Sequence, residues 1–91
     1  MKNTLEKLRK SNDKIDKKLI KLFCKRMKNC REIGAVKKAE NAEIFDAKRE
    51  AEVLSNSRKY ANGEFENYAL EFMKSTVAIS KELQKTEREK Q

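Results

Sequence analysis

Apolar side chains recur in alternating steps of three and four along the first part of the chain, from about Thr4 to Lys38. This spacing is typical of one amphipathic helix. A helix of roughly 35 residues is roughly 50 Å long, far longer than a compact domain of this size. We therefore expect it to pack along another long helix, supplied by a second copy of the chain. The apolar positions are Leu5, Leu8, Ile15, Leu19, Leu22, Ile33 and Val36, widened by Ile20, Phe23, Met27 and Cys30.

The pattern breaks at residues 39–43, AENAE, which predicts a loop. A second helix is predicted to begin near Asp46, with this residue as its N-cap, because Asp accepts hydrogen bonds from the free amides of a first turn. It is predicted to end at Asn62 and Gly63. We expect Gly63 to take the left-handed conformation that ends many helices.

A third helix is predicted over about residues 64–85, where aromatic and aliphatic side chains repeat every seven positions. No strand pattern is present. The sequence therefore predicts an all-α fold of one long, one short and one medium helix. We expect a single domain over residues 1–91, with 86–91 as a frayed tail. The repeating positions are Phe65, Phe72 and Ile79, joined by Tyr68, Ala69, Thr76 and Leu83.

Composition adds a reason for self-association and a hint of the ligand. Of 91 residues, 42% are charged and only 37% hydrophobic, so one chain can build little core. The net charge of +8 suits nucleic acid, an anionic membrane surface or a small polyanion. Cys24 and Cys30 face different directions on a helix, and the chain has no histidine, so no metal site is predicted. Free thiols and the absence of a long apolar run predict a cytoplasmic protein without a membrane span.

The informative positions are polar residues that interrupt the apolar stripes. Arg26 and Lys37 are eleven residues apart, so they share a helix face, roughly 16 Å apart along its axis. Ser80 and Gln84 are one turn apart on the third helix and also share a face. A single arginine on such a stripe is more often a residue that reaches solvent or sets register. The case for a ligand site therefore rests on the whole set.

The segment IFDAKRE, residues 44–50, allows two interpretations. It is a helix start, with Asp46 as the cap, and it can also form one wall of a polar site. Asp46, Arg49 and Glu50 are three or four residues apart, so they share a face, whereas Lys48 between them is expected to face solvent.

Taken in order, these residues resemble the all-helical, AroQ-class chorismate mutases. The resemblance runs from LEKLRKSNDKIDKKLIKLFCKR through REIGAVK and IFDAKRE to ISKELQ. Asn12 and Asp13 depart from the family, which often has an apolar residue or Ser there, and AENAE lacks a proline often seen before the D-x-x-R-E motif. The family's polar positions are filled by Arg9, Arg26, Lys37, Asp46, Arg49, Glu50, Ser80 and Gln84.

The resemblance implies a monofunctional isomerase that converts chorismate to prephenate in phenylalanine and tyrosine biosynthesis, without cofactor or metal. It implies that Lys37 and Gln84 are catalytic, as donors to the ether oxygen whose bond breaks. Glu50 is the implied partner of the ring hydroxyl. The implied substrate-binding residues are Arg9, Arg26, Asp46, Arg49, Glu50 and Ser80, with Ile33, Val53 and Val77 as apolar walls.

The two carboxylates of chorismate call for two cationic clamps, and Arg9 and Arg26 are the candidates. They are seventeen residues apart, roughly 25 Å on one helix. If both hold one substrate, Arg9 must come from the other subunit. This agrees with the intertwined homodimer that the resemblance implies.

Three alternatives remain open from the sequence. An isochorismate pyruvate-lyase or an aminodeoxychorismate mutase would share the fold and the clamps. A basic coiled-coil module that binds nucleic acid or a partner helix would explain the charge and the long helix, but not the polar interruptions. We expect chorismate and a second copy of the chain as partners, and neither nucleic acid nor a membrane.

Overall fold

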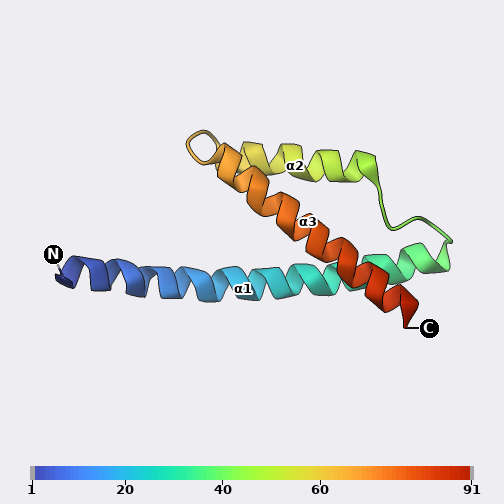
Figure 1. The fold of residues 1–91 in the computed structure, drawn as a ribbon, viewed down its shortest axis with the longest axis horizontal. Helices are drawn as coiled ribbons and strands as arrows, with labels where there is room; N and C mark the ends of the chain where they lie inside the picture. Colours follow the sequence, from blue (N-terminus) through green and yellow to red (C-terminus); the bar gives the residue numbers. More distant parts are fainter. Residues whose placement is uncertain (1, 91) are drawn as a thin grey trace.

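The computed structural model describes residues 2–90, which form three helices in chain order (Figure 1). These are α1 (Lys2–Ala39), α2 (Ala47–Ala61) and α3 (Glu66–Glu89). No strand occurs within this range. The prediction of one long, one short and one medium helix is confirmed.

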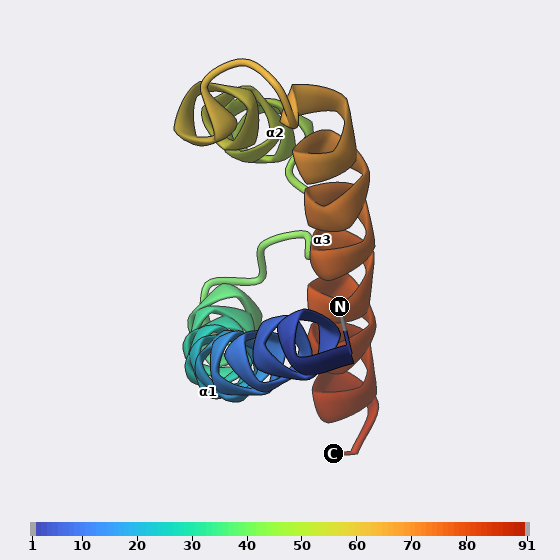
Figure 2. The ribbon, with the colours of Figure 1, turned by 90° about the vertical axis from the view of Figure 1, so that its left-hand side faces the viewer.

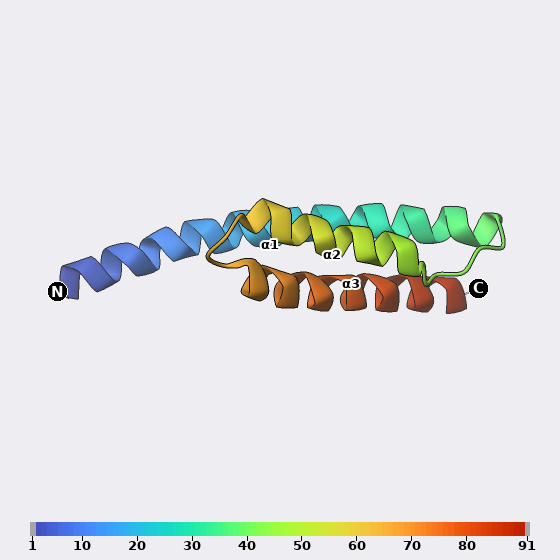
Figure 3. The same cartoon turned by 90° about the horizontal axis from the view of Figure 1, so that it is seen from above.

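Helix α1 makes the molecule elongated. The chain measures 57 × 28 × 13 Å, and its radius of gyration is 16.7 Å, against about 12 Å for a compact chain of this length. Seen from above, the N-terminal part of α1 extends well beyond α2 and α3 (Figure 3). Every residue from 3 to 22 is exposed in the single chain.

Helix α3 joins the other two helices. It packs against both α1 and α2, whereas α1 and α2 do not pack on each other anywhere in residues 2–90. Figure 2 shows α1 and α2 on the same side of α3, one above the other. Side chains from all three helices can therefore converge on the space beside α3.

The ends of α2 are set by two local interactions. Asp46 has an extended backbone, and its Oδ1 accepts a hydrogen bond from the Arg49 amide at 3.0 Å, which confirms the predicted N-cap. At the other end, Asn62 occupies the left-handed cap with φ 49°, and its amide donates to the Arg58 carbonyl. Gly63 follows directly after the cap with φ 118°, so it has the positive φ predicted for it, although Asn62, which tolerates this conformation too, takes the αL cap itself.

Helix α3 begins slightly later and ends later than predicted. Residues 86–89 of the expected tail belong to α3, and Gln91 lies outside the described residues.

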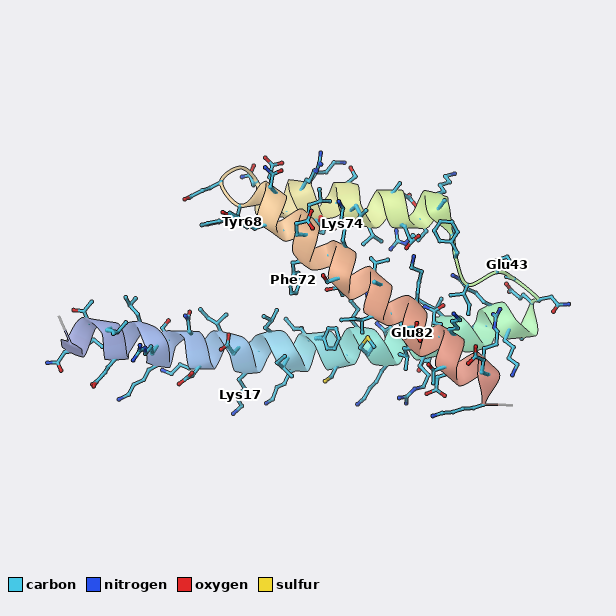
Figure 4. All side chains as sticks on the ribbon, in the orientation of Figure 1. Lys17, Glu43, Tyr68, Phe72, Lys74 and Glu82 are labelled. Carbon is cyan, nitrogen blue, oxygen red and sulfur yellow. The ribbon has the colours of Figure 1, made fainter. Side chains whose placement is uncertain are left out.

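The single chain has almost no apolar core. Among residues 3–90, the buried ones are Cys30, Ser57, Thr76, Ser80 and Gln84. On α3 the buried line is thus polar, whereas the predicted heptad line of Phe65, Phe72 and Ile79 is exposed. Figure 4 shows Tyr68 and Phe72 standing off the surface of α3. The polar line of α3 faces α1 and α2, and the apolar line remains uncovered.

Within residues 2–90, no helix combines the length and the apolar character that crossing a membrane requires.

Candidate functional site

One pocket lies where α1, α2 and α3 converge beside the loop of residues 40–46. Seven of the eight polar residues selected from the sequence line it, together with the three predicted apolar walls; Arg9 does not. The lining consists of Arg26, Cys30, Ile33 and Lys37 from α1, Ile44 and Asp46 from the loop, Arg49, Glu50 and Val53 from α2, and Val77, Ser80, Lys81 and Gln84 from α3.

Arg26 is held in the pocket by neutral partners. Its Nη1 donates to Ser80 Oγ at 2.6 Å and lies 3.7 Å from Cys30 Sγ. Ser80 in turn donates to the Thr76 carbonyl at 2.9 Å, so a lone pair of Oγ is available to Arg26. No carboxylate among residues 2–90 forms an ion pair with Arg26. Its charge is therefore oriented but not neutralised, which suits an anionic ligand.

Lys37 lies further along α1 than Arg26 and is also held by a neutral partner. Its Nζ donates to the Ile44 carbonyl at 2.8 Å, which ties it to the loop that leads into α2. An ammonium group has three donors, so two remain for a ligand. The predicted shared face of Arg26 and Lys37 is confirmed, because both side chains line the same pocket.

Asp46 and Arg49 are the exposed charged residues of the pocket lining. One oxygen of Asp46 caps α2, which leaves the other for a ligand. The Arg49 side chain is 64% exposed and its Nη1 lies 4.0 Å from Glu52 Oε1, a weak surface pair. Lys48 is exposed and does not line the pocket, as predicted.

Glu50 has a partner that the sequence analysis missed. Its Oε1 lies 2.7 Å from Nζ of Lys81, with side chains 20% and 39% exposed. Lys81 also lies over the ring of Phe45, 4.9 Å from the centroid. The available signal was position, since Lys81 is four residues after Val77 and three before Gln84, on the same helix face. Cys30 and Ile44 were also missed as lining residues.

Gln84 is held by close packing against α1. A Cβ placed on Gly34 would lie 3.0 Å from Gln84 Cγ, so the absence of a side chain at Gly34 lets α3 approach. Gln84 is buried, and its Oε1 has no hydrogen-bond partner among the described residues. A buried amide oxygen without a partner is costly, so Oε1 calls for a hydrogen-bond donor that the described residues do not supply.

The charges of the lining favour a small dianion. Four cationic side chains and two carboxylates line the pocket, which leaves a net charge of +2 from this chain. The lining offers several kinds of hydrogen-bonding group: cations that suit carboxylates, carboxylates that suit hydroxyls, and an amide and an ammonium that suit a neutral or partly charged oxygen. No group of three or more His, Cys, Asp or Glu side chains within the described residues could hold a metal ion.

Comparison with known proteins agrees with this geometry. The family model described as chorismate mutase type II matches residues 8–85, a span that includes Arg9 and all the polar residues of the pocket. Searches of curated proteins and of solved structures found no match. Because the match covers most of the chain, the protein belongs to the type II chorismate mutase family.

Proposed function

We propose that the protein converts chorismate to prephenate and so serves phenylalanine and tyrosine biosynthesis. The observation that carries the proposal is the convergence of eight polar side chains, seven of them selected from the sequence and the eighth Lys81, on one pocket of net charge +2. Chorismate is a dianion with a ring hydroxyl and an ether oxygen, and the pocket offers a group for each of them.

The reaction is an intramolecular rearrangement, so the protein has to hold the substrate in a compact conformation and stabilise the charge that develops. Arg26 grips one carboxylate, with Ser80 beside it. Lys37 and Gln84 donate to the ether oxygen as its bond breaks. Glu50 accepts from the ring hydroxyl, and Asp46 and Arg49 close the outer wall.

The second carboxylate requires Arg9, which this chain places outside its own pocket. We propose that Arg9 comes from a second copy in an intertwined homodimer. The surface area supports this. The single chain exposes 7816 Å², whereas a compact monomer of 10.7 kDa exposes about 5,500 Å². The excess of roughly 2,300 Å² is typical of the surface that one subunit contributes to an obligate interface.

The test is ultraviolet monitoring of chorismate disappearance, combined with a molecular-mass measurement. A dimer that forms prephenate supports the proposal, and a folded dimer without turnover contradicts it. Release of pyruvate from isochorismate, or faster turnover of aminodeoxychorismate, would instead indicate one of the related enzymes on this fold.

Lys37→Ala tests the site assignment separately. Loss of a donor to the developing charge should lower kcat by about 10²–10³-fold. Lys48→Ala is the control: it also removes one lysine charge, but from an exposed position on α2 that does not line the pocket. This variant should leave the rate unchanged. Full activity of Lys37→Ala would overturn the assignment even if the protein is a mutase.

A further inference from the structure

Lys81 differs from the other cations of the pocket in its contacts. Within the described residues, Lys81 forms an ion pair with a carboxylate of the pocket, and the other pocket cations do not. Its Nζ lies 2.7 Å from Glu50 Oε1. The pair joins α3 to α2, and the Phe45 ring lies against the same ammonium at 4.9 Å. Two contacts therefore fix the position of Lys81 Nζ beside Glu50.

We propose that Lys81 determines substrate specificity: it makes the site select a ring hydroxyl over a ring amino group. The inference rests on the proposed function, in which Glu50 binds the ring substituent. It concerns the choice between chorismate and 4-amino-4-deoxychorismate, whose primary amine is largely protonated near neutral pH.

A carboxylate alone would not make this choice. An unpaired Glu50 would bind an ammonium more strongly than a hydroxyl, because charge-assisted hydrogen bonds are stronger than those with one neutral partner. With Lys81 at 2.7 Å, the charge of Glu50 is already balanced. A second ammonium on the substrate would then be repelled by Lys81.

A neutral hydroxyl avoids this repulsion. Lys81 contacts Oε1, which leaves Oε2 of Glu50 to accept a hydrogen bond from the hydroxyl. The pair is only partly exposed, at 20% for Glu50 and 39% for Lys81, so water and salt screen the repulsion less than on an open surface. The same pair of side chains thus accepts one substituent and disfavours the other.

The experiment measures kcat/KM for chorismate and for 4-amino-4-deoxychorismate with the wild type, Lys81→Met and Lys81→Arg. The ratio of the two values should favour chorismate in the wild type and fall at least about tenfold in Lys81→Met. Lys81→Arg keeps the charge and should keep the preference. Lys85→Met, which removes a charge one turn further along α3 outside this pocket, is the matched control and should leave the ratio unchanged.

Using the ratio separates specificity from general damage to the site, because damage lowers both values together. Lys81→Gln is the second neutral variant if Lys81→Met does not fold. If the wild type converts chorismate but the neutral variants change the ratio of the two kcat/KM values by less than twofold, the role of Lys81 is overturned while the proposed function stands. A folded wild type that converts neither compound contradicts the proposed function, and this inference with it.

Discussion

Gln84 is a buried amide. In the proposed mechanism it donates to the ether oxygen, and an amide can donate at every working pH. We therefore expect wild-type activity to be nearly flat from roughly pH 6 to 8. A glutamate at this position would donate only when protonated. In Gln84→Glu, activity should be strongly reduced at pH 8 and rise as the pH falls.

The measurement is kcat/KM against pH for both proteins, with circular dichroism to show that the fold is intact. A Gln84→Glu variant with the flat profile and the rate of the wild type would rule out Gln84 as the donor. A steep fall of wild-type activity between pH 6 and 8, with the fold intact, would do the same.

At the residue scale, the sequence located most of the pocket because polar residues on apolar stripes are conspicuous. This signal selected four residues that do line the pocket: Arg26, Lys37, Ser80 and Gln84. Lys81 was missed because, in the sequence, nothing distinguishes it from the other cations of a chain with 23 Lys and Arg residues. Its pairing with Glu50 depends on how α2 and α3 lie against each other, which the periodicity of either helix alone does not determine.

At the element scale, Gly34 sets how closely α3 approaches α1. Alanine is usually favoured over glycine inside a helix by about 1 kcal/mol, but here its Cβ would lie 3.0 Å from Gln84 Cγ. Gly34→Ala should therefore leave the thermal unfolding midpoint nearly unchanged while the displaced Gln84 lowers kcat by about 10- to 100-fold. In a Gln84→Ala background the same substitution should have no further effect, and an equal loss in both backgrounds would show that Gln84 does not transmit it.

Asp46 serves α2 as a cap and the proposed site as a wall, and two substitutions separate these roles. Asp46→Ala removes the bond from the Arg49 amide and should cost about 1 kcal/mol of stability as well as activity. Asp46→Ser keeps a capping oxygen but loses the carboxylate. It should unfold like the wild type and lose activity at least about tenfold. Thermal unfolding and the chorismate assay measure the two effects, and full activity of Asp46→Ser would remove Asp46 from the site.

The existence and order of the helices followed from the sequence, but the start of α3 and the residue that takes the αL cap of α2 did not. Asn62 and Gly63 both accept a positive φ, so composition alone could not decide which one ends α2. The length of α3 was also underestimated, because the charged residues after Lys85 carry no apolar signal although they are good helix formers.

At the scale of the whole molecule, the proposed dimer predicts that each site uses Arg26 from one chain and Arg9 from the other. Arg9→Ala and Arg26→Ala homodimers should each be nearly inactive. A heterodimer of the two variants contains one complete site and one that lacks both arginines. Mixing and refolding equal amounts should therefore recover about a quarter of wild-type activity, because about half of the dimers are heterodimers with one site each.

This recovery is measured with the chorismate assay before and after denaturation and refolding of the mixture. Refolding each variant alone is the control. Absence of recovery, with dimers formed, would show that Arg9 acts in its own chain or not at all.

The sequence predicted the long helix and its need for a partner, but it could not predict which helices pack within one chain. The periodicity predicts that the apolar stripe of α1 and the heptad line of α3 are buried. In the single chain, however, Leu8, Ile15 and Phe72 are exposed. Periodicity marks a face that is to be covered without saying which chain covers it. The internal contacts instead use the polar line of α3, where small and amide side chains allow close approach.

The uncovered half of α1, residues 3–22, has a thermodynamic consequence. A charged helical segment of this length that is exposed throughout is only marginally stable in water. If a second chain supplies the missing contacts, folding and association become one equilibrium, and the unfolding temperature rises with protein concentration. On dilution, the first half of α1 would then unwind as the subunits separate, and each pocket would lose its Arg9.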